Sequence, residues 1–252
     1  MIGLLWLAWM LAGPVQAAEP LRTWSKSAGI HIGAAVDVEV LNKDPAYARL
    51  LAREFNVVTP ENALKFSVVQ PERGRFDFSQ ADALVAFAEA HGMQVHGHVL
   101  VWHGQLPEWL ARGSFTRDEL GAILRAHIQT LVGRYRGRIA WWDVAAEAVD
   151  EAGRPRETFW SRGLGPDYLE RAFRWAHEAD PNARLLYNDY GGEGAGARCL
   201  QHVAAGQVGR RTFICRFHLR PSLFTRPRVP HPPQNDTRDV GAGPSAVQWE
   251  NG

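Results

Sequence analysis

Two short segments of the sequence gather the polar and aromatic side chains that sugar-binding sites use. Residues 59–65 supply a carboxylate, an amide and an ammonium group from Glu61, Asn62 and Lys65. Residues 97–107 add imidazole, indole and carboxamide groups. Such polar groups can hydrogen-bond hydroxyls while an indole covers the apolar C–H face of a pyranose ring. The two segments therefore indicate a protein that handles polysaccharide.

The composition is typical of one globular domain. The chain has 252 residues, of which 46% are hydrophobic and 22% charged, so it can bury a sizeable core. Its 28 basic and 27 acidic residues give a formal net charge of +1, which offers no electrostatic footprint for nucleic acid or an anionic membrane. We therefore expect a neutral substrate and no nucleic-acid or membrane partner. We also expect a monomer that needs no cofactor and no metal.

The first 18 residues have the character of a secretory leader. They are apolar and end in the small-residue pattern of a cleavage site, although no positively charged region precedes them. We predict a signal peptide over residues 1–18, a catalytic domain over residues 19–252, and a secreted or periplasmic location. In such an oxidising compartment the two cysteines, Cys199 and Cys215, can be bridged or free.

Short β-like runs alternate with helix-like stretches along the rest of the chain. Ser79 is expected to cap one helix, and Thr116 with Glu119 forms a capping box at the start of another. The runs are apolar on both faces, which indicates a parallel sheet covered by helices. The predicted strands cover residues 30–36, 56–58, 94–101, 138–144 and 184–187, and the predicted helices cover residues 45–55, 79–91, 116 onward and 167–178.

This alternation and the chain length favour an α/β fold of the (β/α)8 TIM-barrel type, with a doubly wound sheet as the second choice. No glycine-rich phosphate-binding fingerprint follows the first strand, which weighs against the doubly wound sheet. Barrel enzymes build their sites at the C-terminal ends of the strands. Those positions are taken here by Glu61, His98, Trp102, Glu147, Asn188 and Tyr190.

Four segments then resemble, in order and in spacing, the motifs of glycoside hydrolase family 10, which consists chiefly of endo-1,4-β-xylanases. They are residues 59–65, 97–107, 142–148 and 187–190. The resemblance runs from about residue 29 to residue 194. Taken singly, the same residues have ordinary explanations: Glu61, Asn62 and Lys65 as an ion pair at a helix end, Asn188 as a turn residue and Tyr190 as a half-buried aromatic.

The resemblance implies endo-acting hydrolysis of β-1,4-xylan by a retaining mechanism. In such an enzyme one carboxylic acid protonates the leaving oxygen while a second carboxylate, about 5 Å away, attacks the anomeric carbon. Glu147 is similar in position to the family's acid/base.

The resemblance also implies roles for the other polar residues. Glu61, Asn62 and Lys65 match positions that bind the sugar on the non-reducing side of the cleavage point. His98, Trp102 and Gln105 match residues that line the sugar being cleaved. The residues near the catalytic carboxylates would be Asn188, Tyr190 and, as a support for the nucleophile, His218.

One departure falls directly beside the acid/base. The family has Asn before this glutamate, whereas this chain has Ala146. That amide hydrogen-bonds the 2-hydroxyl of the reacting sugar, a contact that strengthens toward the transition state. Losing such a donor costs on the order of 10²–10³ in rate.

The C-terminal part departs further. Residues 212–219 read as a sixth strand, but prolines crowd residues 221–233, where the family has a helix, and proline inside a helix costs about 3 kcal/mol. Residues 246–252 stand where the family carries its nucleophile strand, which makes Glu250 the candidate nucleophile. We expect a barrel that is truncated or degenerate after its fifth or sixth βα unit.

Two other functions stay open. A catalytically defective relative would bind xylo-oligosaccharides without turnover. A metal-dependent barrel hydrolase is the lesser alternative, because His96 and His98 lie on one face of a strand. Such sites need further His and Asp ligands at later strand ends, and Glu147 has no His beside it in the sequence.

Overall fold

The computed structural model describes residues 18–150, 152–189, 216–217 and 247–249. Its centre is one sheet with the strand order β6-β5-β4-β3-β2-β1-β7. Strands β2 to β5 each pair in parallel with the strand that precedes them in the sequence. This order, without the reversal of a doubly wound sheet, is that of a (β/α)8 barrel and confirms the predicted fold class. The five strands are β1 His31–Val36, β2 Val57–Pro60, β3 Gln94–Val101, β4 Trp141–Ala146 and β5 Arg184–Asp189.

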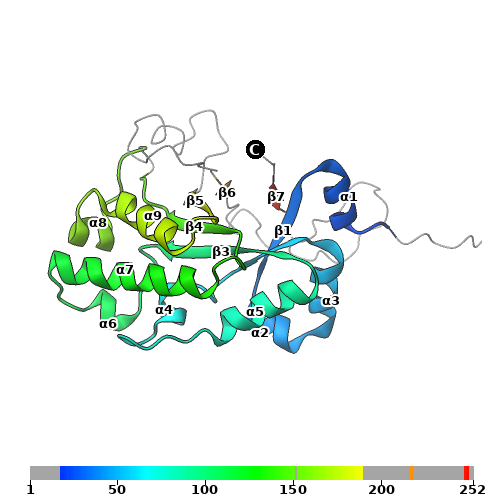
Figure 1. The fold of residues 1–252 in the computed structure, drawn as a ribbon, viewed down its shortest axis with the longest axis horizontal. Helices are drawn as coiled ribbons and strands as arrows, with labels where there is room; N and C mark the ends of the chain where they lie inside the picture. Colours follow the sequence, from blue (N-terminus) through cyan, green and yellow to red (C-terminus); the bar gives the residue numbers. More distant parts are fainter. Residues whose placement is uncertain (1–17, 151, 190–215, 218–246, 250–252) are drawn as a thin grey trace, which may run out of the picture.

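The described helices cover the outside of the sheet. Figure 1 shows α7, α8 and α9 beside β3, β4 and β5, whereas α1 and α3 lie at the β1 side of the molecule. The helices are α1 Leu21–Ala28, α2 Val38–Lys43, α3 Pro45–Glu54, α4 Phe66–Val69, α5 Ser79–Ala90, α6 Glu108–Ala111, α7 Arg117–Arg134, α8 Phe159–Leu164 and α9 Tyr168–Ala179.

The predicted strands and long helices are confirmed with small shifts at their ends. Strand β3 has its predicted bounds, and β2 and β5 extend two residues further at their C-terminal ends. Strand β4 begins at Trp141 rather than at residue 138, because the Arg138 N–H donates to the carbonyl of Tyr135 in the turn after α7. The short helices α1, α2, α4, α6 and α8 were not predicted, because they span only four to eight residues, too few for a helical period to show.

The two predicted helix starts had different outcomes. The capping box before α7 is confirmed: the Thr116 N–H donates to Glu119 Oε2 at 2.8 Å, and the Glu119 N–H donates to Thr116 Oγ1 at 3.2 Å. The prediction for Ser79 is wrong, because Ser79 is the first helical residue of α5. Its N–H donates to the carboxylate of Asp77 at 2.9 Å, so a charged acceptor takes the role assigned to Ser79.

Alternate side chains of β4 face two different interiors. Trp142 and Val144 pack into the main core between the sheet and the helices, while Trp141 belongs to a smaller cluster with Val57 and Leu186. Both faces of the strand are buried, as the apolar sequence predicts. Gly97 on β3 is required here, since a Cβ at that position would collide with the Trp142 ring.

The last two described strands are short. Strand β6, Arg216–Phe217, pairs in parallel with β5 and lies within the predicted sixth strand. Strand β7, Val247–Trp249, is also extended as expected, but it runs antiparallel to β1, with Trp249 opposite His31. The direction is opposite to that of a barrel strand. The open edge of β1 offers backbone groups that a strand of either direction can pair with.

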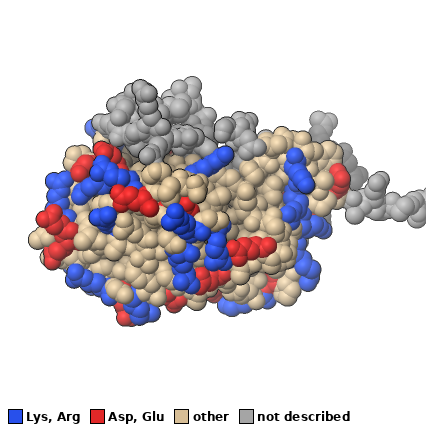
Figure 2. Space-filling model, in the orientation of Figure 1, with Lys and Arg blue, Asp and Glu red and all other residues tan. Residues whose placement is uncertain are grey.

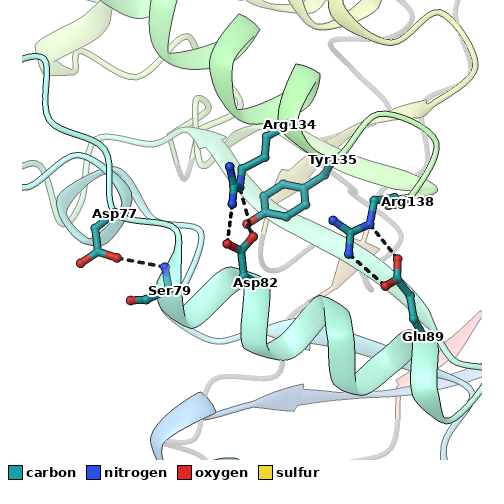
Figure 3. A network of polar contacts seen from close by, with 7 residues as sticks. All are labelled: Asp77, Ser79, Asp82, Glu89, Arg134, Tyr135 and Arg138. Carbon is teal, nitrogen blue, oxygen red and sulfur yellow. Dashed lines mark hydrogen bonds and ion pairs between the residues drawn. The ribbon is translucent and has the colours of Figure 1, made fainter.

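Charged side chains join the outer helices to one another. Asp82 on α5 accepts hydrogen bonds from Arg134 Nε at 3.1 Å and from the Tyr135 hydroxyl at 2.9 Å (Figure 3). Arg138 donates to both carboxylate oxygens of Glu89, at 2.7 and 2.9 Å. These pairs fasten the C-terminal end of α7 to α5.

The visible surface carries charges of both signs. Figure 2 shows Lys and Arg side chains interspersed with Asp and Glu over the helices of this face, with no large patch of one sign. No helix in the described ranges is long and apolar enough to cross a membrane. The predicted signal peptide, apart from its last residue, and both cysteines fall outside the residues that the structure describes.

Candidate active site

A buried carboxylate, Asp143, organises the inside of the sheet. Its Oδ1 lies 2.8 Å from Nε2 of His96, and its Oδ2 lies 2.8 Å from Nδ1 of His98. Asn188 on β5 donates from Nδ2 to the same Oδ2 at 3.1 Å. The alternation of side chains along β3 and the register of His98 with Asp143 bring these groups together. One carboxylate thus fixes two imidazoles and one amide.

The environment keeps Asp143 ionised. Burial alone would raise its pKa, but the charges of His96 and His98 and their hydrogen bonds outweigh burial and lower the pKa well below its usual range. Asp143 was not predicted as a functional residue. The available signal was a charged residue inside a strand that is otherwise apolar on both faces, between Trp142 and Val144.

The proposed acid/base, Glu147, directly follows β4. Its φ is 54°, a left-handed conformation that is uncommon for residues other than glycine, and its N–H donates to the carbonyl of Asn188 at 2.9 Å. This turn takes the chain out of the sheet at the carboxyl end of the strand. The side chain is 29% exposed, so the carboxylate can meet both protein groups and a ligand from solution.

The imidazole of His103 lies close to this carboxylate. Its Nε2 lies 4.0 Å from Oε2 of Glu147. Burial lowers the pKa of His103, Glu147 opposes that shift, and Arg156 adds to it. His103 was not predicted as a site residue, although it lies between Trp102 and Gln105 in the segment of residues 97–107.

The groups that follow β2 and β3 meet each other. Lys65 donates from Nζ to Asn62 Oδ1 at 3.0 Å, and Gln105 Nε2 lies 3.4 Å from the same oxygen. The Lys65 ammonium also sits over the Trp102 ring, 5.0 Å from its centroid. Burial lowers the pKa of Lys65, while the negative charges of Glu61 and Glu147 oppose that shift. Lys65 therefore lies in the field of both carboxylates.

Trp102 is contacted at its main chain and at its ring. Its main-chain carbonyl accepts a hydrogen bond from Trp160 Nε1 at 3.0 Å. A Cβ on Gly104 would come within 2.6 Å of the indole ring, so glycine lets the backbone pass close to its edge. Trp102 Nε1 is buried and has no hydrogen-bond partner among the described residues. The Trp102 ring thus lies beside Lys65 with a buried N–H that no described residue accepts.

The structure brings most of the predicted site residues to one end of the sheet. Those it describes there are Glu61, Asn62, Lys65, His98, Trp102, Gln105, Glu147 and Asn188. Tyr190, His218 and Glu250 lie outside the described residues, so their roles stay predictions. Ala146 is 6% exposed and pairs in register with Asn188, which puts the departure from the family pattern inside this cluster.

Metal-ligating residues do not gather in the described ranges. No group of three or more His, Cys, Asp or Glu side chains there is arranged to hold a metal ion. The pair that suggested a metal, His96 and His98, is instead bonded to the two oxygens of Asp143.

Comparison with known proteins adds the relatives of this chain. It is 46% identical over 173 residues to endo-1,4-beta-xylanase B of Thermotoga neapolitana, a match that covers 68% of this chain and 50% of that protein. A match at 43% identity to endo-1,4-beta-xylanase B of Paenibacillus barcinonensis covers 68% of this chain and 52% of the relative. The chain therefore spans about half the length of these curated relatives.

Solved structures agree with the sequence matches. Native xylanase 10B from Thermotoga maritima has a TM-score of 0.72 and 39% identity, over 79% of this chain and 64% of that one. Xylanase 10B from Thermotoga petrophila, in complex with xylobiose, has a TM-score of 0.73 and 38% identity, over 82% and 65%. The family model described as glycosyl hydrolase family 10 matches residues 20–205. The chain belongs to glycosyl hydrolase family 10.

Proposed function

We propose that this protein is a secreted glycoside hydrolase that cleaves internal linkages of β-1,4-xylan with retention of configuration. The observation that carries the proposal is the Glu147 carboxylate at the end of β4, 4.0 Å from His103 and acting electrostatically on Lys65. The groups around Lys65 supply the hydrogen bonds and the indole face that a xylose ring needs. The relatives named endo-1,4-beta-xylanase, and the xylobiose complex of one of them, support the choice of sugar.

In the proposed first step, Glu147 gives its proton to the glycosidic oxygen as the bond from that oxygen to the anomeric carbon breaks. A second carboxylate attacks the anomeric carbon from the other face and forms a glycosyl-enzyme ester. In the second step Glu147, now ionised, takes a proton from water, and the hydroxide equivalent displaces the carboxylate. The sugar leaves with its original configuration.

Glu250 remains the proposed nucleophile on its chain position alone. Strand β7, which precedes it, pairs antiparallel to β1, and Trp249 lies opposite His31, the first residue of β1. The carboxyl end of β1, where the other site groups gather, is the far end of that strand. Glu250→Ala tests the assignment directly: the proposal predicts loss of xylan hydrolysis, and a variant that hydrolyses xylan normally would remove Glu250 from the mechanism.

Glu147→Gln is the test of the acid. The amide keeps the shape of the side chain but cannot give a proton, so we expect hydrolysis of unactivated xylan to fall by about 10²–10⁴. Reducing-end release from β-1,4-xylan by residues 19–252 measures the effect, with circular dichroism to establish that both chains fold. Full activity in the variant would refute the role of Glu147.

Ala146→Asn tests the proposed impairment. Asparagine at this position restores a donor to the 2-hydroxyl of the reacting sugar, and we expect kcat/KM to rise by an amount on the order of 10²–10³. Unchanged turnover in a folded variant would show that the missing amide does not limit this enzyme. A folded parent that binds xylo-oligosaccharides without hydrolysing them would favour the alternative, a sugar-binding relative, which Ala146 specifically suggests.

A further inference from the structure

A groove of about 330 Å³ lies outside the site described above, between α7 and the turn that follows α4. Glu119, Ala122, Ile123 and Ala126 form its wall on α7, and their spacing puts them on one face of that helix. The two alanines leave the space open between larger neighbours. The volume falls within the range of small-molecule sites, and none of the groove's lining residues belongs to the cluster around Glu147.

Gln70, one of the residues that line this groove, carries a buried amide oxygen without a hydrogen-bond donor among the described residues. Gln70 is only 6% exposed, and its Oε1 has no hydrogen-bond partner among the described residues. The main-chain carbonyl of Gln70 is already used, because it accepts a hydrogen bond from Trp109 Nε1 at 3.1 Å. A buried acceptor without a partner is unfavourable and rare. The wall of the groove therefore contains an acceptor whose hydroxyl or N–H donor is not supplied by the described residues.

The rim of the groove carries one charge of each sign. Arg73 sits at the tip of a turn closed by the Glu72–Arg75 ion pair at 2.8 Å, with Gly74 at φ 78°. Its guanidinium lies 5.6 Å from the centroid of the Phe115 ring, and it is close enough to Glu119 to lower the pKa of that carboxyl, after the hydrogen bonds from Thr116. The opposite charges make the rim neutral overall, so the groove selects neither anions nor cations.

The rest of the lining is apolar and partly aromatic. Phe76 and Trp109 contribute rings from the turn and from α6, and Ile123 contributes its side chain from α7. A neutral ring that has an apolar face and several hydroxyls matches this combination of surfaces and acceptors. A pyranose is such a ring.

We infer that this groove binds one pyranose of a neutral oligosaccharide, as a second sugar site apart from the catalytic cluster. A hydroxyl of the sugar donates to Gln70 Oε1, the charged groups of Arg73 and Glu119 bond hydroxyls at the rim, and the C–H face lies against the apolar lining. The inference rests on the proposed function only for the choice of xylose as the sugar. Binding of a sugar in the groove does not require the protein to hydrolyse xylan.

Nuclear magnetic resonance can detect ligand binding in this groove separately from binding at the catalytic site. Xylotriose is titrated into residues 19–252 carrying Glu147→Gln, which protects the probe, with isotope-labelled isoleucine methyl groups. We expect the Ile123 methyl resonance to shift and to saturate at millimolar xylotriose. No movement of this resonance with xylotriose or with cellotriose would overturn the inference, and Gln70 would then be served by water alone.

Two substitutions decide whether such a shift arises in the groove. Ala126→Leu fills the space and should abolish the Ile123 shift, whereas the matched control Thr130→Leu, exposed on the same helix, should leave it intact. Gln70→Met keeps the size of the side chain and removes the acceptor, so it should weaken binding at least about tenfold. A shift that survives both Ala126→Leu and Gln70→Met contradicts the inference.

Measurements of hydrolysis distinguish the second sugar site from the proposed catalytic activity. With Glu147 in place, Ala126→Leu should release reducing ends from soluble xylo-oligosaccharides at the parental rate, because the groove lies outside the catalytic cluster. Loss of the Ile123 shift with normal hydrolysis supports the second site. An inactive parent whose Ile123 methyl still responds to xylotriose would refute the proposed activity and leave the second site standing.

Discussion

Two fully buried histidines lie in opposite surroundings. His96, on β3 inside the sheet, has its Nε2 2.8 Å from the Asp143 carboxylate. His127, on α7 in the layer between sheet and helices, stacks on the Phe66 ring at 3.7 Å, and neither of its ring nitrogens has a hydrogen-bond partner in the described part of the chain. The two side chains are equally buried. They differ in that a neighbouring strand supplies His96 with a carboxylate partner.

The same contrast governs charge in the two layers. Inside the sheet, the charges of His96 and His98 and their hydrogen bonds outweigh the effect of burial and lower the pKa of Asp143, so this carboxylate stays ionised at zero exposure. In the helix layer, burial alone lowers the pKa of His127 to about 3, so this imidazole is neutral. A low dielectric strengthens a satisfied network and penalises a lone charge.

Removing Asp143 should produce the largest effect, because it breaks the satisfied network. Asp143→Ala removes the carboxylate that bonds Asn188 and the imidazoles of His96 and His98. Because buried polar groups then lose their partner, we expect the free energy of unfolding to fall by about 3–5 kcal/mol. Urea unfolding at neutral pH measures it. Asp143→Asn, which keeps the shape but not the charge, should lose about 1–3 kcal/mol. If the alanine variant unfolds at the parental midpoint, the network does not stabilise the sheet.

His127 should make the protein less stable in mild acid. The unfolded chain binds a proton at this residue near pH 6.5, and the folded chain does so only near pH 3. Between these values the unfolded state binds more protons, so stability is complete above pH 6.5 and falls with pH by up to about 1.4 kcal/mol per unit. His127→Leu, similar in volume and unable to ionise, should remove about 2–3 kcal/mol of this loss between pH 6.5 and 4.5.

The comparison of parent and variant isolates this one residue. Burial also lowers the pKa values of His31 and His103, but these groups are common to both chains, so their contributions cancel. The free energy of unfolding from urea titrations at several pH values gives both curves. Parallel curves for parent and His127→Leu would mean that His127 takes up a proton in the folded state, contrary to its environment.

The sequence predicted the barrel and its working end because both depend on simple patterns. Apolar runs mark β1 to β5, and polar residues such as Glu61 and Glu147 stand directly after them. Asp143 was missed because the pattern of β4 shows only that it is buried, whereas its partners come from β3 and β5 through the sheet register. Tertiary pairing, and not local sequence, decides such a role.

The direction of β7 escaped prediction for a related reason. Residues 247–249 have the character of a strand, which the structure confirms. A three-residue segment carries no signal for the direction of its pairing, and the free edge of β1 accepts either. The short helices α4 and α6 were missed similarly, since a single turn shows no period.

The exposed ion pair between Arg134 and Asp82 is a third polar environment, and we expect its removal to have the smallest effect on stability. Arg134 on α7 forms an ion pair with Asp82 on α5 (Figure 3) and lies 4.4 Å from the centroid of the Phe78 ring. The two charged side chains are 42% and 40% exposed. Water already solvates such charges, so Arg134→Met, which keeps much of the packing over the ring, should cost about 1 kcal/mol or less, and raising the salt concentration should shrink the difference. Thermal unfolding at low and high salt measures both. A loss as large as that of Asp143→Ala would show that pairing across the helices, and not burial of a satisfied carboxylate, dominates the stability of this fold.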